Sequence, residues 1–526
     1  MMIKPNRYIL SIDHGTSGVK AAIVSTHGEV VDWGYEPTPM HFFPNGGAEQ
    51  NPDDWWRALV LASQKVIHRQ APLAVKISAV SVSSTFSSTV AVDRNGRHLM
   101  NSLTWMDSRG ARYVKEVMQG FPSVNGYGLA TVLRWVYITG GGPALSGKDD
   151  IAHVLLIKYE HPEVYEQTYQ FLGSKDYLNL RLTGEYAAAP DSITLFWVTD
   201  IRNIQRVRYD DTLIARLKID KGKLPPLRSS VDALGPLRPQ VAEELGLGQD
   251  VQVFMGAPDH QCALIGSGAV TDFKGHLYIG TSSWIECIVP FKKTDVDHNI
   301  ASLAAAIPGK YQCINEQDIA GGCLPFLLDN LIFYKNALQK NDPPEKPFAL
   351  MDEIAASVLP GSDKVIFVPW LNGERSPVDN TTLRGGLFNL SVRTNQNHLV
   401  RAVLEGVAYN TRWSMKYVEK FIGRKMDSLN IVGGGGNSDV WCQIFSDVLD
   451  REICKVKNPQ MTNARGAAFL ASVGLGDITF ADIPTLIQYE KSFTPALANR
   501  ALYDVLFAEF LAIYKNNKSI FRRLNG

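Results

Sequence analysis

The chain has 526 residues, of which 45% are hydrophobic and 20% are charged, so it holds enough apolar material for more than one buried core. Lys plus Arg total 53 and Asp plus Glu total 53, which leaves a formal net charge of zero. This balance argues against a nucleic-acid binder and leaves no basic segment for a membrane surface.

The cysteines and the apolar runs exclude further classes of protein. The six cysteines form no CxxC pair and the histidines form no HExxH motif, which argues against a disulfide framework and a structural zinc site. No signal-peptide pattern opens the chain, and the longest uncharged runs, 77–92 and 117–133, are interrupted by Ser or by Gly, Pro and Asn. We therefore expect a soluble, cytoplasmic protein in a reducing compartment.

The first 95 residues alternate between strand and helix patterns. Apolar runs at 8–12, 19–24 and 30–31 are separated by turns rich in Gly, Ser and Thr, which predicts three consecutive strands. Asn51 and Pro52, followed by two aspartates, predict a helix that runs to about residue 70. Further strands are predicted at 77–82 and 90–93. This alternation favours a layered α/β domain.

The opening pattern returns in the middle of the chain. Gly280–Ser283 lies 265 positions after Gly15–Gly18, and each tetrad stands between two apolar strands. The repeat predicts two related α/β domains that face one cleft. We expect a first domain at 1–255, a second at 256–490 and a helical tail at 491–526. The apolar run at 251–256 is interpreted as the start of the second domain, with the boundary placed near Met255, and the Gly- and Pro-rich stretch 222–239 as part of the connection.

The repeated tetrads are candidate phosphate-binding turns. Thr16 and Ser17 offer hydroxyls and consecutive N–H groups that suit phosphate oxygens, and Gly280 with Thr281 offers the same chemistry. Ordinary hairpin turns have the same composition, so each turn alone leaves both interpretations open. At equivalent points of two domains, the pair predicts a clamp for one triphosphate.

Two other glycine-rich segments lead to opposite expectations. Four glycines at 433–436, after an apolar strand, permit close approach of a flat ligand such as a purine, with a flexible loop as the alternative. Gly142–Asp149 resembles a P-loop after an apolar run at 136–138. Its last residue is Asp149 where the magnesium-binding Ser or Thr belongs, so we do not expect it to bind phosphate.

Two aspartates are candidates for the chemistry. Asp13 ends the first strand, where a carboxylate can hold magnesium through water. Asp259 follows Pro258 and can accept the proton of an attacking hydroxyl, although a turn or a helix cap is an equally ordinary role. His260 is a further base without a supporting pattern. Trp105 suits either stacking on a sugar or a place in the core.

Motifs along nearly the whole chain resemble the FGGY family of carbohydrate kinases, with the xylulokinases as the most similar branch. Their order and spacing carry the resemblance, at 12–20, 49–56, 175–185, 280–282, 369–377, 401–406 and 433–437. The resemblance implies two actin-like, ribonuclease-H-like ATPase domains flanking a central cleft that holds ATP and a sugar. It implies a kinase for a ketopentose such as D-xylulose, giving D-xylulose 5-phosphate, and it is compatible with a homodimer.

The resemblance also implies roles for single residues. Asp13 matches the acidic residue near Mg²⁺, and Asp259 matches the catalytic base. Thr16 and Ser17 match the first phosphate turn. The remaining matches are Gly280 and Thr281 in the second phosphate turn, and Gly434, Gly435 and Asn437 in the adenosine loop.

Departures from the family pattern gather where the sugar is expected. Phe86 and Ser87 stand where xylulokinases have a Met-His pair, and His260 stands where an amide is usual. Smaller departures are Ser83, His153, Leu156 and Asn389, the last replacing a glycine. The acceptor therefore stays open between a ketopentose, another polyol and a sugar acid. A nucleotide-dependent binding protein without phosphoryl transfer is the alternative of another class.

Overall fold

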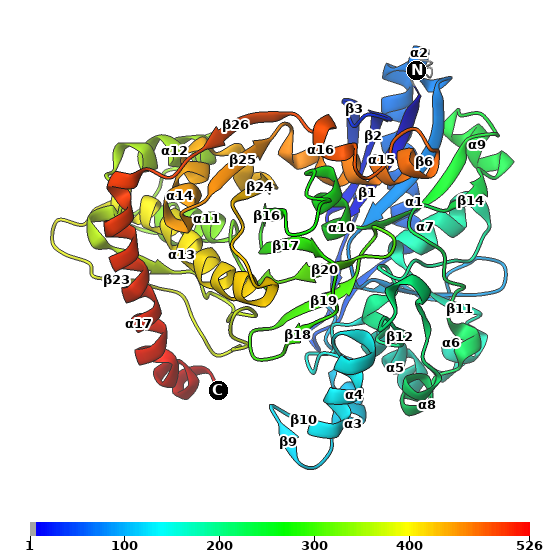
Figure 1. Cartoon of the computed structure of the whole chain (residues 1–526), viewed down its shortest axis with the longest axis horizontal. Coiled ribbons are helices and arrows are strands. Elements are labelled where there is room, and N and C mark those ends of the chain that lie inside the picture. Colours follow the sequence, from blue (N-terminus) through cyan, green and yellow to red (C-terminus); the bar gives the residue numbers. More distant parts are fainter. Residues whose placement is uncertain (1–6) are drawn as a thin grey trace.

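The computed structural model describes residues 7–526, which form two α/β domains side by side (Figure 1). The first domain is built on a six-stranded sheet in the order β14-β15-β6-β1-β2-β3. Its strands are β1 (Tyr8–Gly15), β2 (Gly18–Ser25), β3 (Val30–Pro37), β6 (Ile77–Ser84), β14 (Ala233–Pro236) and β15 (Gln252–Pro258). The interior of β1 is buried on both faces, as expected for a strand covered by helices on each side.

Helices from distant parts of the chain cover the two faces of this sheet. On one face, α1 (Pro52–Arg69) and α7 (Ser174–Thr183) pack on the sheet, and the Asn51 side chain caps α1 as predicted. On the other face lies α15 (Thr462–Gly474), from near the end of the sequence. Beside α15 runs α10 (Asp259–Gly266), which directly follows β15.

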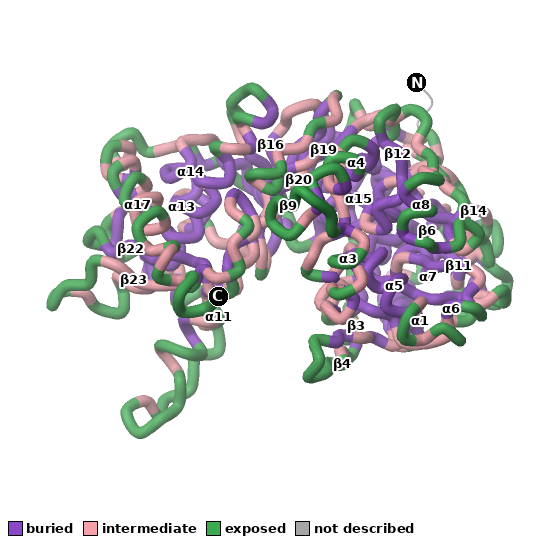
Figure 2. Tube along the Cα trace, turned by 90° about the horizontal axis from the view of Figure 1, so that it is seen from below, coloured by how far each residue is buried: buried purple, intermediate pink, exposed green. Residues whose placement is uncertain are grey.

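The second sheet repeats the strand order of the first. The strands β20 (Tyr311–Ile314), β17 (Ser283–Val289), β16 (Gly275–Ile279), β24 (Ser428–Val432) and β25 (Glu452–Val456) are neighbours in that order. Two antiparallel pairings are followed by two parallel ones, as in β3-β2-β1-β6-β15. The predicted internal repeat is confirmed. Figure 2 shows buried segments in both halves of the molecule.

The strand predicted to open the second domain belongs to the first. Residues 252–258 form β15, which pairs in parallel with β6. The stretch 222–239 is likewise part of the first domain, because β14 borders β15 at the sheet edge. A boundary at 255 cuts through β15, and we propose instead that the first domain continues through α10. Sequence pattern did not reveal this because an apolar strand after a loop suits either sheet.

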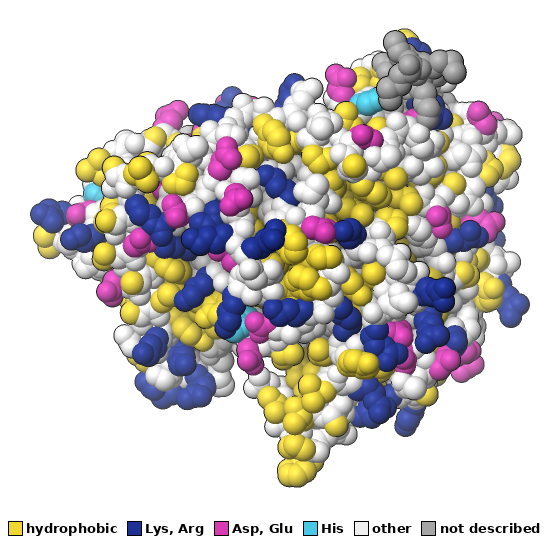
Figure 3. All heavy atoms as spheres, viewed as in Figure 1, with side chains coloured by type: hydrophobic (Ala, Val, Ile, Leu, Met, Phe, Trp, Pro, Cys, Tyr) yellow, Lys and Arg dark blue, Asp and Glu magenta, His cyan; other side chains and the backbone are white. Residues whose placement is uncertain are grey.

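The fold also bears on the P-loop-like segment, the cysteines and the longest helices. Residues 136–138 lie in helix α4 (Leu129–Thr139), so no strand precedes the P-loop-like segment, and Asp149 accepts hydrogen bonds from Ala144 N and Trp197 Nε1, each at 2.7 Å. All six cysteines are buried and free. Within residues 7–526, no helix is long and apolar enough to cross a membrane. Figure 3 shows acidic and basic side chains interspersed on the face drawn.

The tail predicted at 491–526 starts later than expected, because residues 489–493 form β26 (Tyr489–Phe493), which pairs with β25 of the second sheet. The tail helix is α17 (Arg500–Asn525), and it packs on the second domain through α13 (Gln396–Ile422). Their shared contact is the fully buried carboxylate of Glu405, a residue of the motif at 401–406. Glu405 accepts hydrogen bonds from Arg401 Nε at 2.7 Å and Tyr503 OH at 2.8 Å. It also accepts bonds from Gly361 N and Ser362 Oγ. This motif is therefore structural.

Replacing Glu405 with Ala should destabilise the second domain by about 3–5 kcal/mol, because it leaves the buried Arg401 guanidinium without its carboxylate. Urea unfolding followed by tryptophan fluorescence measures the change. The control is Arg57→Ala, which breaks an exposed pair with Asp54 and should cost less than about 1 kcal/mol. Equal, small effects of both variants would contradict this account of α17 docking.

Candidate active site

The first predicted phosphate turn is the hairpin between β1 and β2, and side chains from other segments bind its backbone and the Thr16 hydroxyl. Gln50 Nε2 donates to Thr16 O at 2.9 Å, and Trp105 Nε1 donates to Thr16 Oγ1 at 3.1 Å. Tyr35 OH donates to Ser17 O at 2.8 Å. Ser17 itself is exposed. These bonds fix the backbone of the turn and place Trp105 beside it.

The second turn, between β16 and β17, is supported by a segment that sequence reasoning missed. Gly321 N donates to Gly280 O at 2.8 Å, and Ala320 N donates to Thr281 O at 2.7 Å. A Cβ on Gly321 would collide with Gly280 O, so the glycine allows this close approach. The sequence feature that could have revealed this segment is the Gly321-Gly322 pair, which follows a strand pattern.

The glycine loop at 433–437 lies directly against the second turn. A Cβ on Gly433 would come within 2.5 Å of Ile279 O, one residue before Gly280. Gly434 is exposed with open space around its Cα, and Lys455 Nζ donates to Asn437 O at 3.1 Å. The second turn and this loop therefore form one continuous surface at the ends of β16 and β24.

Asp13, near the end of β1, connects the first turn to α15. Its carboxylate is buried, with Lys20 Nζ 3.4 Å from Oδ2 and Asn463 Nδ2 3.3 Å from Oδ1. Asn463 lies in the first turn of α15. Both contacts are long, so both oxygens keep lone pairs for a further ligand.

A bulge in β15 aims Asp259 away from the sheet. Lys175 Nζ and Asn179 Nδ2 both donate to Met255 O, at 3.0 and 2.9 Å, and the pairing with β6 shifts register at this point. The next residue, Gly256, has φ +66°, and a Cβ there would collide with Val82 O. Only glycine fits this position. The chain then turns into α10, whose first residue is Asp259.

Asp259 is half-buried in the structure. Among residues 7–526, only His260 N donates a hydrogen bond to its carboxylate, to Oδ1 at 2.8 Å. Burial raises the pKa of Asp259 to about 6. The His260 charge opposes this rise, and the Asp13 charge adds to it. Oδ2 therefore accepts no hydrogen bond from residues 7–526, and the carboxyl group is mostly ionised at neutral pH.

His260 pairs with a carboxylate that the sequence analysis did not single out. His260 Nδ1 lies 3.3 Å from Glu286 Oε1, and both side chains are buried. Burial alone would lower the pKa of His260, but the hydrogen bond and charge of Glu286, with the charge of Asp259, outweigh it and raise that pKa. A single acidic residue inside the apolar strand 285–289 was the available signal for Glu286.

Of the predicted sugar-side residues, Phe86 contacts His260. The rings of Phe86 and His260 are 5.0 Å apart, so Phe86 covers the imidazole. Ser87 is buried with φ +58°, and its Oγ donates to Lys148 O at 2.7 Å. Phe86 thus contacts His260, the residue after Asp259. The hydrogen bond of Ser87 connects the loop after β6 to Lys148, in the segment before α5 (Asp150–Glu160).

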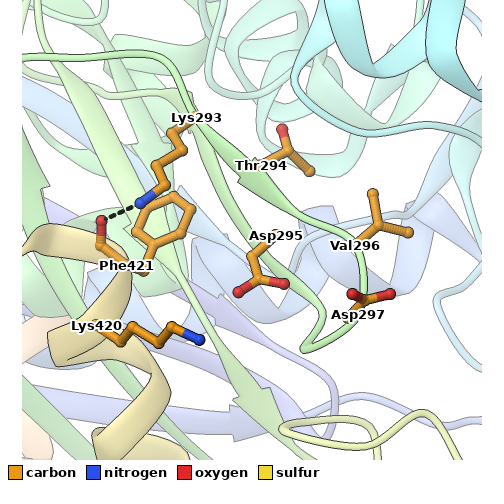
Figure 4. A pocket seen from close by; sticks show the side chains of 7 residues that line it. All are labelled: Lys293, Thr294, Asp295, Val296, Asp297, Lys420 and Phe421. Atoms are coloured by element: carbon orange, nitrogen blue, oxygen red, sulfur yellow. Dashed lines mark hydrogen bonds between the residues drawn. The ribbon is translucent and has the colours of Figure 1, made fainter.

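Figure 4 shows a further surface hollow of the protein. Its volume is about 370 Å³, and it is lined by Lys293, Thr294, Asp295, Val296, Asp297, Lys420 and Phe421. None of the predicted site residues lines it. Within it, Lys293 Nζ donates to Phe421 O at 2.7 Å, so this lysine is already engaged.

Comparison with known proteins identifies the family. Residues 8–266 match the N-terminal domain of the FGGY family of carbohydrate kinases, and residues 277–475 match its C-terminal domain. These ranges cover most of the chain, which therefore belongs to the FGGY family of carbohydrate kinases. The chain is a carbohydrate kinase with a small-molecule sugar substrate, and kinases of this family use ATP, generally with Mg²⁺.

Relatives with different acceptors are equally similar to this chain. It is 26% identical over 520 residues to a xylulose kinase from Bacillus subtilis strain 168, covering 98% of each chain. It is also 26% identical over 505 residues to a gluconokinase from the same strain, covering 96% of this chain and 95% of the other. The solved gluconate kinase from Lactobacillus acidophilus has the same fold, with TM-score 0.84, 24% identity and coverage of 99% and 100%.

One departure from the family pattern has a backbone explanation. Asn389 stands where a glycine is usual, and its φ is +65°. Asparagine tolerates this left-handed conformation better than other residues with a side chain, and here its Nδ2 also donates to Lys364 O at 3.0 Å.

The donor set around Asp13 suits magnesium. Mg²⁺ takes oxygen ligands and is usually held by one or two carboxylates together with substrate phosphates. Asp13 supplies such a carboxylate beside the first turn, and the charge of Asp259 acts on the same region. Among residues 7–526, no group of three or more His, Cys, Asp and Glu side chains that could hold a metal ion is found.

Proposed function

We propose that this chain transfers the γ-phosphoryl group of ATP to a hydroxyl of an open-chain ketopentose such as D-xylulose, giving D-xylulose 5-phosphate. The observation that carries the proposal is the Asp259 carboxylate, which has a free oxygen and a pKa near 6. At neutral pH most of it is ionised, so it can accept the proton of the attacking hydroxyl.

In this proposal each element of the site has one task. The turns at Thr16 and Ser17 and at Gly280 and Thr281 bind the phosphates, and the loop at Gly434, Gly435 and Asn437 binds the adenosine. Asp13 holds the magnesium ion, which supplies neutralising charge to the phosphates when bound. Phe86, Ser87, Trp105 and His260 surround the sugar. Phosphoryl transfer depends on such positioning more than on covalent chemistry.

A sugar acid such as gluconate is the second candidate acceptor, and one observation favours it. The backbone of Lys148 accepts the Ser87 hydroxyl, yet its ammonium has no hydrogen bond or ion pair with any described residue. Burial lowers the pKa of Lys148 and the charge of Arg375 adds to this effect, while the charges of Asp318 and Glu316 oppose it. An unpartnered cation next to the proposed sugar pocket is suited to a carboxylate.

Replacing Asp259 with Asn should lower kcat by roughly 10²–10⁴-fold, because the amide cannot accept the proton. Sugar-dependent ADP release measures kcat, and titration calorimetry with ADP should give an unchanged affinity. Full activity of this variant would remove Asp259 from the role of base. Binding of ATP without turnover of any sugar by the wild type would favour a nucleotide-dependent binding protein.

The acid limb of kcat/KM for the sugar should lie near pH 6, since Asp259 must be ionised to act. Replacing His260 with Gln should move this limb to higher pH, because the protonated imidazole is the charge that favours ionised Asp259. His276→Gln is the control, because burial holds the pKa of His276 at about 3 and the ring is neutral throughout. An unmoved limb in His260→Gln would contradict this coupling.

Replacing Ser87 with His should change the order of preferred acceptors, because it adds a large hydrogen-bonding group at the proposed sugar pocket. The panel contains xylulose, ribulose, glycerol, erythritol and gluconate, each measured by kcat/KM. Ser87→Ala is the control, since it removes only the bond to Lys148 O. An unchanged order in the His variant would show that Ser87 does not face the sugar.

A further inference from the structure

Tyr278 occupies in the second domain the position that Asp13 occupies in the first. Each residue stands two places before the glycine that opens a phosphate turn, Gly280 in one case and Gly15 in the other. Each also lies on the first strand of its sheet, and the two sheets have the same strand order. The repeat therefore places Tyr278 and Asp13 at matching ends of β16 and β1.

The ring of Tyr278 lies over the second turn. A Cβ built on Gly280 would come within 2.5 Å of Tyr278 Cε1 and 2.6 Å of its hydroxyl oxygen, so the phenol end of the ring covers Gly280. The ring is fixed there by Trp284, its cross-strand partner on β17. The two rings stack with centroids 3.9 Å apart and planes 3° from parallel.

The hydroxyl of Tyr278 has no hydrogen-bond partner among residues 7–526, although the side chain is only partly exposed. Burial raises the pKa of this phenol, and the charges of Asp259 and Asp13 raise it further. The hydroxyl therefore stays protonated at any working pH, and it is a donor on which the charges of both carboxylates of the site act.

We propose that Tyr278 is a further catalytic residue, whose hydroxyl donates a hydrogen bond to an oxygen of the phosphoryl group during transfer. The inference rests on the proposed function. Charge in the transition state is spread over three equatorial phosphoryl oxygens. Asp13 and Asp259 add negative charge next to them, so a fixed neutral donor on the opposite domain stabilises this state. The phenol keeps its proton, and no bond to it forms or breaks.

Tyr278→Phe removes the hydroxyl and keeps the ring that stacks on Trp284. We expect kcat to fall about 10- to 100-fold, with the KM values for ATP and sugar within about twofold of the wild type. The control is Tyr186→Phe, whose hydroxyl donates to Asp93 O in the first domain and whose loss should leave kcat unchanged. A kcat of Tyr278→Phe within threefold of the wild type would overturn the proposal.

Binding measurements separate this role from a purely structural one and do not depend on turnover. The affinity for ADP with Mg²⁺ should be equal in the wild type and Tyr278→Phe. With fluoroaluminate, which mimics the phosphoryl group in transfer, the variant should bind ADP at least tenfold more weakly. Equal weakening with and without fluoroaluminate would mean that Tyr278 only shapes the nucleotide site. A wild type that forms the fluoroaluminate complex but phosphorylates no sugar in the panel would refute the proposed function and leave the role of Tyr278 supported by the binding difference.

Discussion

The site depends on one close crossing of two helices. At Gly266 of α10 and Gly466 of α15, a Cβ on either glycine would collide with a backbone carbonyl of the other helix, of Thr462 or Cys262. The first residue of α10 is Asp259, and the first turn of α15 holds Asn463 against Asp13. Backbone-to-backbone contact therefore fixes how α10, which carries Asp259, lies against α15, which contacts Asp13. Larger residues at either glycine would force the helices apart.

This crossing also unites the domains. α15 comes from the second half of the chain but covers the sheet of the first, and Arg465 on α15 donates to Gly28 O of the first domain and Gly266 O. On the remaining side, Lys175 and Asn179 fix the backbone of β15 immediately before Asp259. The two carboxylates lie close enough for the charge of Asp13 to contribute to the raised pKa of Asp259.

Sequence was a good guide to features that are local. The three opening strands, the cap of α1 and the repeated turns follow from hydrophobic period and turn residues, and the family motifs led to the two-domain fold. Pairing partners are not local, so residues 252–258 were assigned to the wrong sheet. Glu286 and the Gly321-Gly322 pair gain meaning only from their contacts with His260 and Gly280, which lie 26 and about 41 positions away in the chain. Periodicity carries no information at those separations.

The departures from the family pattern are unevenly distributed, and this bears on substrate choice. Asp13, Gly280, Thr281 and the 433–437 loop keep the pattern, and these are the residues assigned to the phosphate donor. Phe86, Ser87 and His260 depart from it, and they lie together, with Phe86 covering the imidazole and Glu286 behind it. A buried charged pair is costly to retain unless its geometry is used. Here the contact with Glu286 holds His260 beside Asp259, so the departures gather at the proposed acceptor pocket while the residues proposed for phosphoryl transfer keep the family pattern.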